Sequence, residues 1–146
     1  AISAKLDKRD FKVYVILGDG ELAEGQIWEA VNTASFYKVD NLIAIIDYNK
    51  LQAVGFIKKR YDMGDIRGKF SIFGWKTFEI DGHNMEEIMQ VLDETDDIKG
   101  SPSAIIAHTI KGKGVSFAEN NPLFHNAPLS KEQINRAKKD IIGRIS

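Results

Sequence analysis

Residues 12–20 read Lys-Val-Tyr-Val-Ile-Leu-Gly-Asp-Gly, and residues 41–50 read Asn-Leu-Ile-Ala-Ile-Ile-Asp-Tyr-Asn-Lys. In each stretch an apolar run ends in polar residues, which is typical of a buried strand followed by a loop. The interval between the stretches has room for a loop, a helix and the second strand, as a parallel crossover requires. Both strand ends then lie at one edge of a sheet. We therefore expect Asp19 and Asn49 to meet in space.

The rest of the chain alternates in the same way. Two further apolar runs predict strands, and between the strands apolar residues recur at helical spacing. The order of elements favours an α/β fold, with a mostly parallel sheet and helices on both faces, in one domain over residues 1–146. The further strands are expected at 75–80 and 103–107, and helices at 24–38, 69–73, 85–92 (capped by Asn84) and after Ser130, which pairs with Gln133 as a cap.

Bulk properties narrow the function classes. The 146 residues carry a net charge of −1, with 43% hydrophobic and 28% charged residues, so nothing favours nucleic acid or an anionic membrane as partner. The absence of cysteine excludes disulfides and thiolate metal sites. No apolar run has membrane-span length and no signal peptide is visible, so we expect a cytoplasmic protein. Residues 1–6 resemble the end of a helix without an initiating Met, so we expect an N-terminal part to be missing.

The residue types at the two strand ends suggest metal chemistry. The carboxylate of Asp19 and the amide oxygen of Asn49 are hard ligands of the kind that Mg²⁺ prefers. Gly18 and Gly20 would let a diphosphate approach the backbone N–H groups. Gly-Asp-Gly alone is common in ordinary turns, and Asn49 alone is a common cap residue. The pair at crossover spacing is the more specific signal. A generic nucleotide-binding domain is disfavoured, because the turn lacks a dinucleotide or Walker-type fingerprint.

Longer stretches resemble transketolases, a family of thiamine diphosphate enzymes. The run 18–30, Gly-Asp-Gly-Glu-Leu-Ala-Glu-Gly-Gln-Ile-Trp-Glu-Ala, is similar to the family's metal motif with its flanking residues. The resemblance covers nearly the whole chain, from about Ala4 to Ile142. It implies the diphosphate-binding domain of a transketolase, or the N-terminal subunit of a split one. Further matching stretches are 37–45, 49–52, 73–75, 79–84 and 109–114.

The resemblance assigns residues to roles. Asp19, Asn49 and the backbone carbonyl of Leu51 would bind Mg²⁺ or Ca²⁺. His125 would contact the cofactor and face the substrate, and its alternative is a loop histidine with no role. The remaining implied contacts are Gly18, Gly20 and Glu21 with the cofactor diphosphate, and Glu24 and Glu29 with a neighbouring protein chain at the interface. For Glu24 and Glu29 the alternative is ordinary helix solvation.

Other residues have weaker assignments. Lys111 and Lys113 are either solvated loop charges or anchors for the loop that carries His125. His83 and His108 are expected to be structural. The sequence departs from the family at Asn126, where a glycine is expected, and at Ala53-Val54, which precede Gly55.

The implied reaction transfers a two-carbon ketol unit from a ketose phosphate to an aldose phosphate, as in the pentose phosphate pathway. The family's cofactor-activating glutamate lies on a pyrimidine-binding domain, which this sequence lacks. We therefore expect a dimer or heterotetramer with a pyrimidine-binding partner subunit, and no activity from this chain alone. The alternatives are a deoxyxylulose-phosphate-synthase-like enzyme and a non-catalytic subunit that binds cofactor or only a partner.

Overall fold

A four-stranded parallel sheet forms the centre of the fold. The computed structural model describes residues 1–52, 55, 56, 59 and 61–143. The strand order is β1-β2-β6-β5, and every neighbouring pair is parallel. All four strands predicted from apolar runs are confirmed, with boundaries within one residue: β1 (Val13–Gly18), β2 (Leu42–Tyr48), β5 (Lys76–Asp81) and β6 (Ser103–His108).

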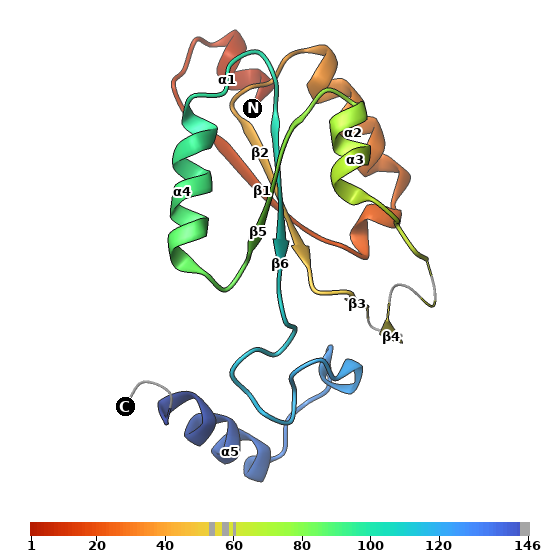
Figure 1. Ribbon diagram of the computed structural model, residues 1–146, viewed down its shortest axis with the longest axis vertical. Coiled ribbons are helices and arrows are strands. Elements are labelled where there is room, and N and C mark those ends of the chain that lie inside the picture. Colours follow the sequence, from red (N-terminus) through yellow and green to blue (C-terminus); the bar gives the residue numbers. More distant parts are fainter. Residues whose placement is uncertain (53–54, 57–58, 60, 144–146) are drawn as a thin grey trace.

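Helices cover both faces of the sheet, as predicted (Figure 1). α2 (Gly25–Phe36) and α3 (Ile66–Ile72) lie on one face, and α4 (Met85–Asp96) lies on the other. The strand order gives the reason. The crossovers from β1 to β2 and from β2 to β5 run across the sheet in one direction, whereas β5 to β6 runs back. Because such crossovers are right-handed, the reversal places α4 on the opposite face.

The alternation of side chains along β2 divides the core in two. Ala44 and Ile46 belong to a large cluster with α2 and α3, whereas Ile43 belongs to a smaller cluster with α4. Burial on both faces explains the unbroken apolar run in the sequence. On α2, Val31 and Ala34 are buried as part of the predicted stripe and Ile27 packs against the core.

One member of that predicted helix stripe lies elsewhere. Ala30 is exposed, because the contacting row of α2 follows the spacing Ile27, Val31, Ala34, and Ala30 flanks this row. The predicted helix caps are found. Asn84 accepts from the backbone N–H groups of Glu86 and Glu87 at the start of α4, and Ser130 forms a capping box with Gln133 at the start of α5 (Lys131–Ile142).

Several short elements were not predicted. Segments of two or three residues are too short to show a periodic pattern. The N-terminal helix α1 covers Ile2–Leu6. The unpredicted elements are the antiparallel pair β3 (Leu51–Gln52) and β4 (Gly55–Phe56), and the 3₁₀ turns η1 (Glu21–Ala23) and η3 (Pro122–Phe124).

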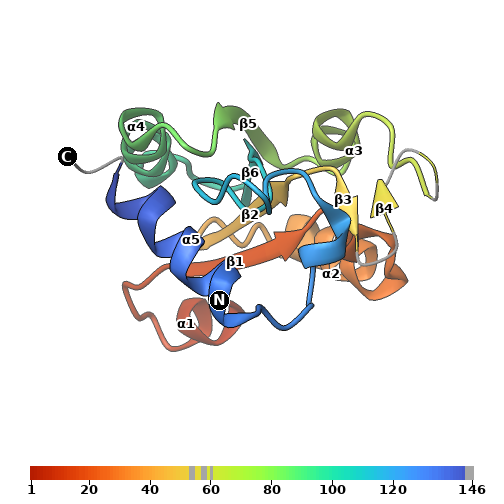
Figure 2. The same ribbon diagram turned by 90° about the horizontal axis from the view of Figure 1, so that it is seen from below.

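The segment that follows β6 crosses the carboxyl ends of the strands. Figures 1 and 2 show it lying with α5 beyond that edge of the sheet. Asp140 of α5 accepts hydrogen bonds from the backbone N–H and the hydroxyl of Ser116, at 2.8 and 2.7 Å. This contact ties α5 to the segment. Among the described residues, no helix has the length and apolar character that a membrane span requires.

Candidate functional site

The two strand ends meet as the crossover spacing predicts. Gly18 at the end of β1 lies in register with Asp47 of β2. The backbone N–H of Lys50 donates to Oδ2 of Asp19 at 2.5 Å, which joins the loop after β2 to the loop after β1. A cavity of about 390 Å³ opens at this junction. Its lining includes every residue predicted to contact metal or cofactor: Gly18, Asp19, Gly20, Glu21, Asn49, Leu51 and His125, together with Asp47, Gln52 and Lys111.

Asp19 is the most buried charged group of the cavity, with 1% of its surface exposed. Burial raises the pKa of its carboxyl to about 6, and the charge of Asp47 adds to the rise. The backbone N–H groups of Lys50 and Gly20 and the charge of Lys111 act in the opposite direction. A carboxylate that its surroundings stabilise so incompletely favours a nearby cation.

Asn49 is held by groups on both sides of its amide. Its Nδ2 donates to Oδ2 of Asp47 at 3.0 Å, and its Oδ1 accepts from the backbone N–H of Leu51 at 2.9 Å. The hydroxyl of Thr109, which follows β6, donates to the other oxygen of Asp47. This network fixes which way the amide points, and one lone pair of Oδ1 remains available for a ligand.

Asp47 and Lys111 are the cavity residues whose place the sequence reasoning missed. Asp47 precedes Asn49 by two positions, and alternate residues of a strand project to the same side, so the alternation along β2 was a usable signal. Lys111 was expected to anchor a loop or to be solvated. Its half-buried side chain instead lines the cavity, and nothing local in the sequence indicates this.

The backbone around the cavity turns sharply. Lys50 has a φ of 65°, in the left-handed region, and this turn directs Leu51 into β3. Gly20 faces the side chain of Gln52, because a Cβ added at Gly20 would lie 2.7 Å from Cγ of Gln52. The carboxylate of Glu21 accepts from the N–H of Gly18 at 3.3 Å. The wall of the cavity is thus backbone and short side chains, which suits close approach by a diphosphate.

The charges of the cavity fit a divalent cation bound together with an anion. Three carboxylates, those of Asp19, Glu21 and Asp47, face one ammonium group, that of Lys111. An anionic diphosphate alone would be repelled by this lining, and a divalent cation reverses the balance. No group of three or more His, Cys, Asp or Glu side chains among the described residues could hold a metal ion. A carboxylate, an amide oxygen and a backbone carbonyl are nevertheless sufficient for Mg²⁺, which takes its remaining ligands from phosphate and water.

The three histidines lie in different surroundings. His125 ends η3, is exposed and lines the cavity. The backbone at Asn126 stays outside the left-handed region, so the glycine expected there is not needed for backbone conformation. His108 pairs with Glu79 at 2.6 Å, between Nε2 and Oε1, and is not part of the cavity lining. His83 accepts a hydrogen bond from Ile110.

The remaining predicted positions lie away from the cavity. Glu24 and Glu29 are exposed, at the start of α2 and within it. Lys113 is exposed as well. Ala53 and Val54, where the sequence departs from the family pattern, lie outside the described residues.

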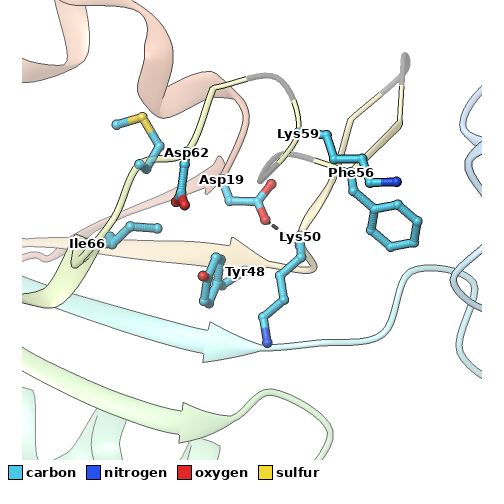
Figure 3. Close-up of a pocket in the computed structure, with 8 residues that line it drawn as sticks. Asp19, Tyr48, Lys50, Phe56, Lys59, Asp62 and Ile66 are labelled. Carbon is cyan, nitrogen blue, oxygen red and sulfur yellow. Dashed lines mark hydrogen bonds between the residues drawn. The ribbon is translucent and has the colours of Figure 1, made fainter.

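A second cavity, of about 500 Å³, lies beside Asp19. Figure 3 shows Asp19 directed between the loop after β2 and the segment that leads to α3, with Tyr48 and Lys50 nearby. Burial raises the pKa of Tyr48. The lining alternates in charge and polarity, so it defines no single ligand class: Asp19, Tyr48, Lys50, Phe56, Lys59, Asp62, Met63 and Ile66.

Comparison with known proteins places this geometry in a family. The family described as "Transketolase, thiamine diphosphate binding domain" matches residues 3–143. One of the two subunits of the apulose-4-phosphate transketolase of Phocaeicola vulgatus is 40% identical over 99% of this chain and 52% of its own length. Human transketolase is 38% identical over 95% of this chain and 22% of its own length. The crystal structure of Campylobacter jejuni transketolase superposes with a TM-score of 0.86 at 34% identity, over 92% of this chain and 21% of that one.

Proposed function

The chain belongs to the transketolase family of thiamine diphosphate-binding domains, and from this membership we propose that it is the diphosphate-binding part of a two-subunit transketolase. Residues 1–146 form part of that domain in this proposal. The chain spans about half the length of the Phocaeicola vulgatus relative, at 52% of it. The activity of the whole enzyme is therefore proposed from the site.

One observation carries the proposal. The residues that the family motif assigns to metal and diphosphate come from β1, β2 and the segment after β6, and all of them line one cavity at the carboxyl ends of the strands. Ligands of open α/β sheets occupy this location. The excess of carboxylates in the cavity supports a divalent cation as an obligatory part of the bound cofactor.

Each residue then has a role. Asp19, the amide oxygen of Asn49 and the carbonyl of Leu51 bind Mg²⁺ or Ca²⁺, and the ion carries the cofactor diphosphate. Gly18, Gly20 and Glu21 contact the diphosphate. When bound, thiamine diphosphate supplies the nucleophilic carbon and the electron sink for cleavage of a bond next to a carbonyl. His125 at the exposed rim donates a hydrogen bond toward cofactor and substrate.

The partner in this proposal is a pyrimidine-binding subunit. Support comes from the Phocaeicola vulgatus relative, which is named as a transketolase subunit, and from the relative in Clostridium sp. named as a 6-deoxy-6-sulfo-D-fructose transketolase subunit, 39% identical over 97% of this chain. Glu24 and Glu29 face that partner or a second copy, in a dimer or heterotetramer. The substrates are sugar phosphates or closely related ketoses, and the reaction is ketol transfer. A cytoplasmic location stays a prediction.

Titration calorimetry tests the site. The full-length protein, together with its partner subunit, should bind thiamine diphosphate in the presence of Mg²⁺ and lose this binding in EDTA. Asp19→Ala should abolish binding, whereas Asp93→Ala on the exposed side of α4 is the matched control. Equal affinity without metal, or in Asp19→Ala, would contradict the assigned site.

Activity assays separate the proposed enzyme from its alternatives. We expect turnover of xylulose 5-phosphate with ribose 5-phosphate, or of the ketoses named for the two relatives. Turnover of pyruvate with glyceraldehyde 3-phosphate would instead indicate a deoxyxylulose-phosphate-synthase-like enzyme. Cofactor binding without turnover of any of these by the assembled complex would indicate a non-catalytic subunit.

A further inference from the structure

His83 contacts the segment that leads into the cofactor cavity. It lies in the turn between β5 and α4, and its Nε2 accepts a hydrogen bond from the backbone N–H of Ile110 at 2.8 Å. An N–H donor requires a lone pair opposite it, so Nε2 carries no proton in this arrangement and the neutral ring is protonated at Nδ1. The family motif gives this histidine no role at the cofactor.

The turn that carries His83 is packed closely against the same segment. The N–H of Gly82 donates to the carbonyl of His108 at 2.8 Å. A Cβ added at Gly82 would lie 2.5 Å from Cγ2 of Thr109 and 3.2 Å from that carbonyl. The N–H of His83 itself donates to Oδ1 of Asp81 at 2.8 Å. The backbone around His83 is therefore fixed, and its ring has a defined target.

Ile110 lies between two residues that belong to the site. Before it, Thr109 donates its hydroxyl to Asp47 and its N–H to the carbonyl of Tyr48, at 3.3 Å for the latter. After it, Lys111 lines the cavity and lowers the pKa of Asp19 by its charge. The hydrogen bond from Ile110 to His83 thus holds the chain at the point where it passes from the sheet to Lys111.

We propose that His83 is a positioning residue for the cofactor site, which acts by holding Ile110 so that the ammonium group of Lys111 faces the diphosphate cavity. The inference rests on the proposed cofactor function. Among the described residues that line this cavity, Lys111 is the lysine or arginine that can oppose the diphosphate charge. A shift of its backbone would move that charge away from the anion, and supporting partners of this kind typically change affinity about 10- to 100-fold.

Three replacements of His83 separate positioning from general stability. His83→Gln keeps an acceptor oxygen at similar reach, His83→Leu removes the acceptor, and His83→Lys places a donor opposite the N–H of Ile110. The assay is the Kd of thiamine diphosphate at saturating Mg²⁺, for the full-length protein with its partner subunit. We expect about a tenfold rise of the Kd for Leu and Lys, and a change within about twofold for Gln.

A double-mutant cycle with Lys111→Met tests the route. If His83 acts through Lys111, His83→Leu should raise the Kd in the wild-type background and leave it unchanged in Lys111→Met. Hydrogen exchange of the Ile110 amide, measured without cofactor, should be faster in His83→Leu and normal in His83→Gln. If His83→Leu does not fold, His83→Lys takes its place in both measurements.

The outcomes distinguish the two proposals. Loss of binding in Asp19→Ala with an unchanged Kd in His83→Leu overturns the role of His83 alone. An equal fold-change from His83→Leu in both Lys111 backgrounds overturns it as well, because the effect then bypasses Lys111. Failure of the wild-type complex to bind thiamine diphosphate overturns both proposals.

Discussion

The side-chain amide of Asn49 donates to Oδ2 of Asp47 across 3.0 Å, so a carboxylate at the sheet edge orients the neighbouring amide oxygen. Thr109 holds the other oxygen of the same carboxylate. Two strands and the segment after β6 are joined at this point. The arrangement means that Asp47 acts on the proposed metal through Asn49, which gives the first prediction.

Replacement of Asp47 should weaken metal-dependent cofactor binding. In Asp47→Asn, the one acceptor oxygen of the new amide cannot serve both Asn49 and Thr109. We expect about a tenfold higher Kd for thiamine diphosphate at limiting Mg²⁺, with a smaller effect at saturating Mg²⁺. Calorimetry at two Mg²⁺ concentrations measures this. Thr109→Val, which removes one donor and keeps the carboxylate, is the matched variant and should lose less. Equal affinities for wild type and Asp47→Asn would show that Asn49 is oriented by other contacts.

Asp19→Asn should stabilise the metal-free protein. The folded-state pKa of Asp19 is raised from 3.8 to about 6, so the folded state binds this proton more tightly than the unfolded state. The stabilisation is present below about pH 4 and is lost as the pH rises through about 6. Above that, the charged carboxylate costs about 3 kcal/mol, at roughly 1.4 kcal/mol for each pKa unit.

The measurement is urea unfolding of both proteins from pH 5 to 8 in EDTA. The advantage of Asp19→Asn should grow with pH and approach about 3 kcal/mol near pH 8. Addition of Mg²⁺ and thiamine diphosphate should reverse the order, because only the wild type binds them. Asp93→Asn on exposed α4 is the control. An advantage of Asp19→Asn that shrinks as the pH rises would contradict the assigned burial cost.

Lys50 should tolerate glycine better than valine. Its φ of 65° is a conformation that costs an L-residue about 1–2 kcal/mol, and glycine avoids this cost. The N–H that donates to Asp19 is present in every variant. We expect Lys50→Gly to stay within about 1 kcal/mol of wild type, because the gain is partly offset by the backbone entropy of glycine. Lys50→Val should lose at least about 1 kcal/mol. Urea unfolding checks the order, and a more stable valine variant would show that the turn is not left-handed in solution.

The sequence was most informative where burial imposes a continuous pattern. β2 and β6 are enclosed by helices on both faces, so Ile43, Ile46 and Ile106 appear as parts of unbroken apolar runs. The meeting of Asp19 and Asn49 could be predicted because a crossover of known length has few possible ends. Helix starts were visible at Asn84 and Ser130, where the capping chemistry is local.

The parts that escaped prediction depend on contacts distant in sequence. Lys111 enters the cavity because His83 and Thr109 hold its backbone, and these bonds join residues 27 and 62 positions apart. The cavity in Figure 3 combines side chains from β2, β4 and the segment before α3. No local period connects such residues. Ala30 shows a limit of another kind, since an apolar residue beside a buried row is not thereby buried.

Replacement of His125 should separate catalysis from folding. The side chain is exposed and lies at the rim of the cavity, so His125→Ala should leave the free energy of unfolding within about 0.5 kcal/mol of wild type. If the imidazole donates toward reacting groups, turnover by the complex with its partner should fall about 100-fold or more. The Kd of thiamine diphosphate should change far less, because the metal and the Lys111 charge hold the diphosphate. Stopped-flow turnover and calorimetry on the same preparations measure the two quantities, with Asn126→Ala as the neighbouring control. Parallel losses of affinity and turnover would make His125 a binding residue, and unchanged turnover would leave it an ordinary loop histidine.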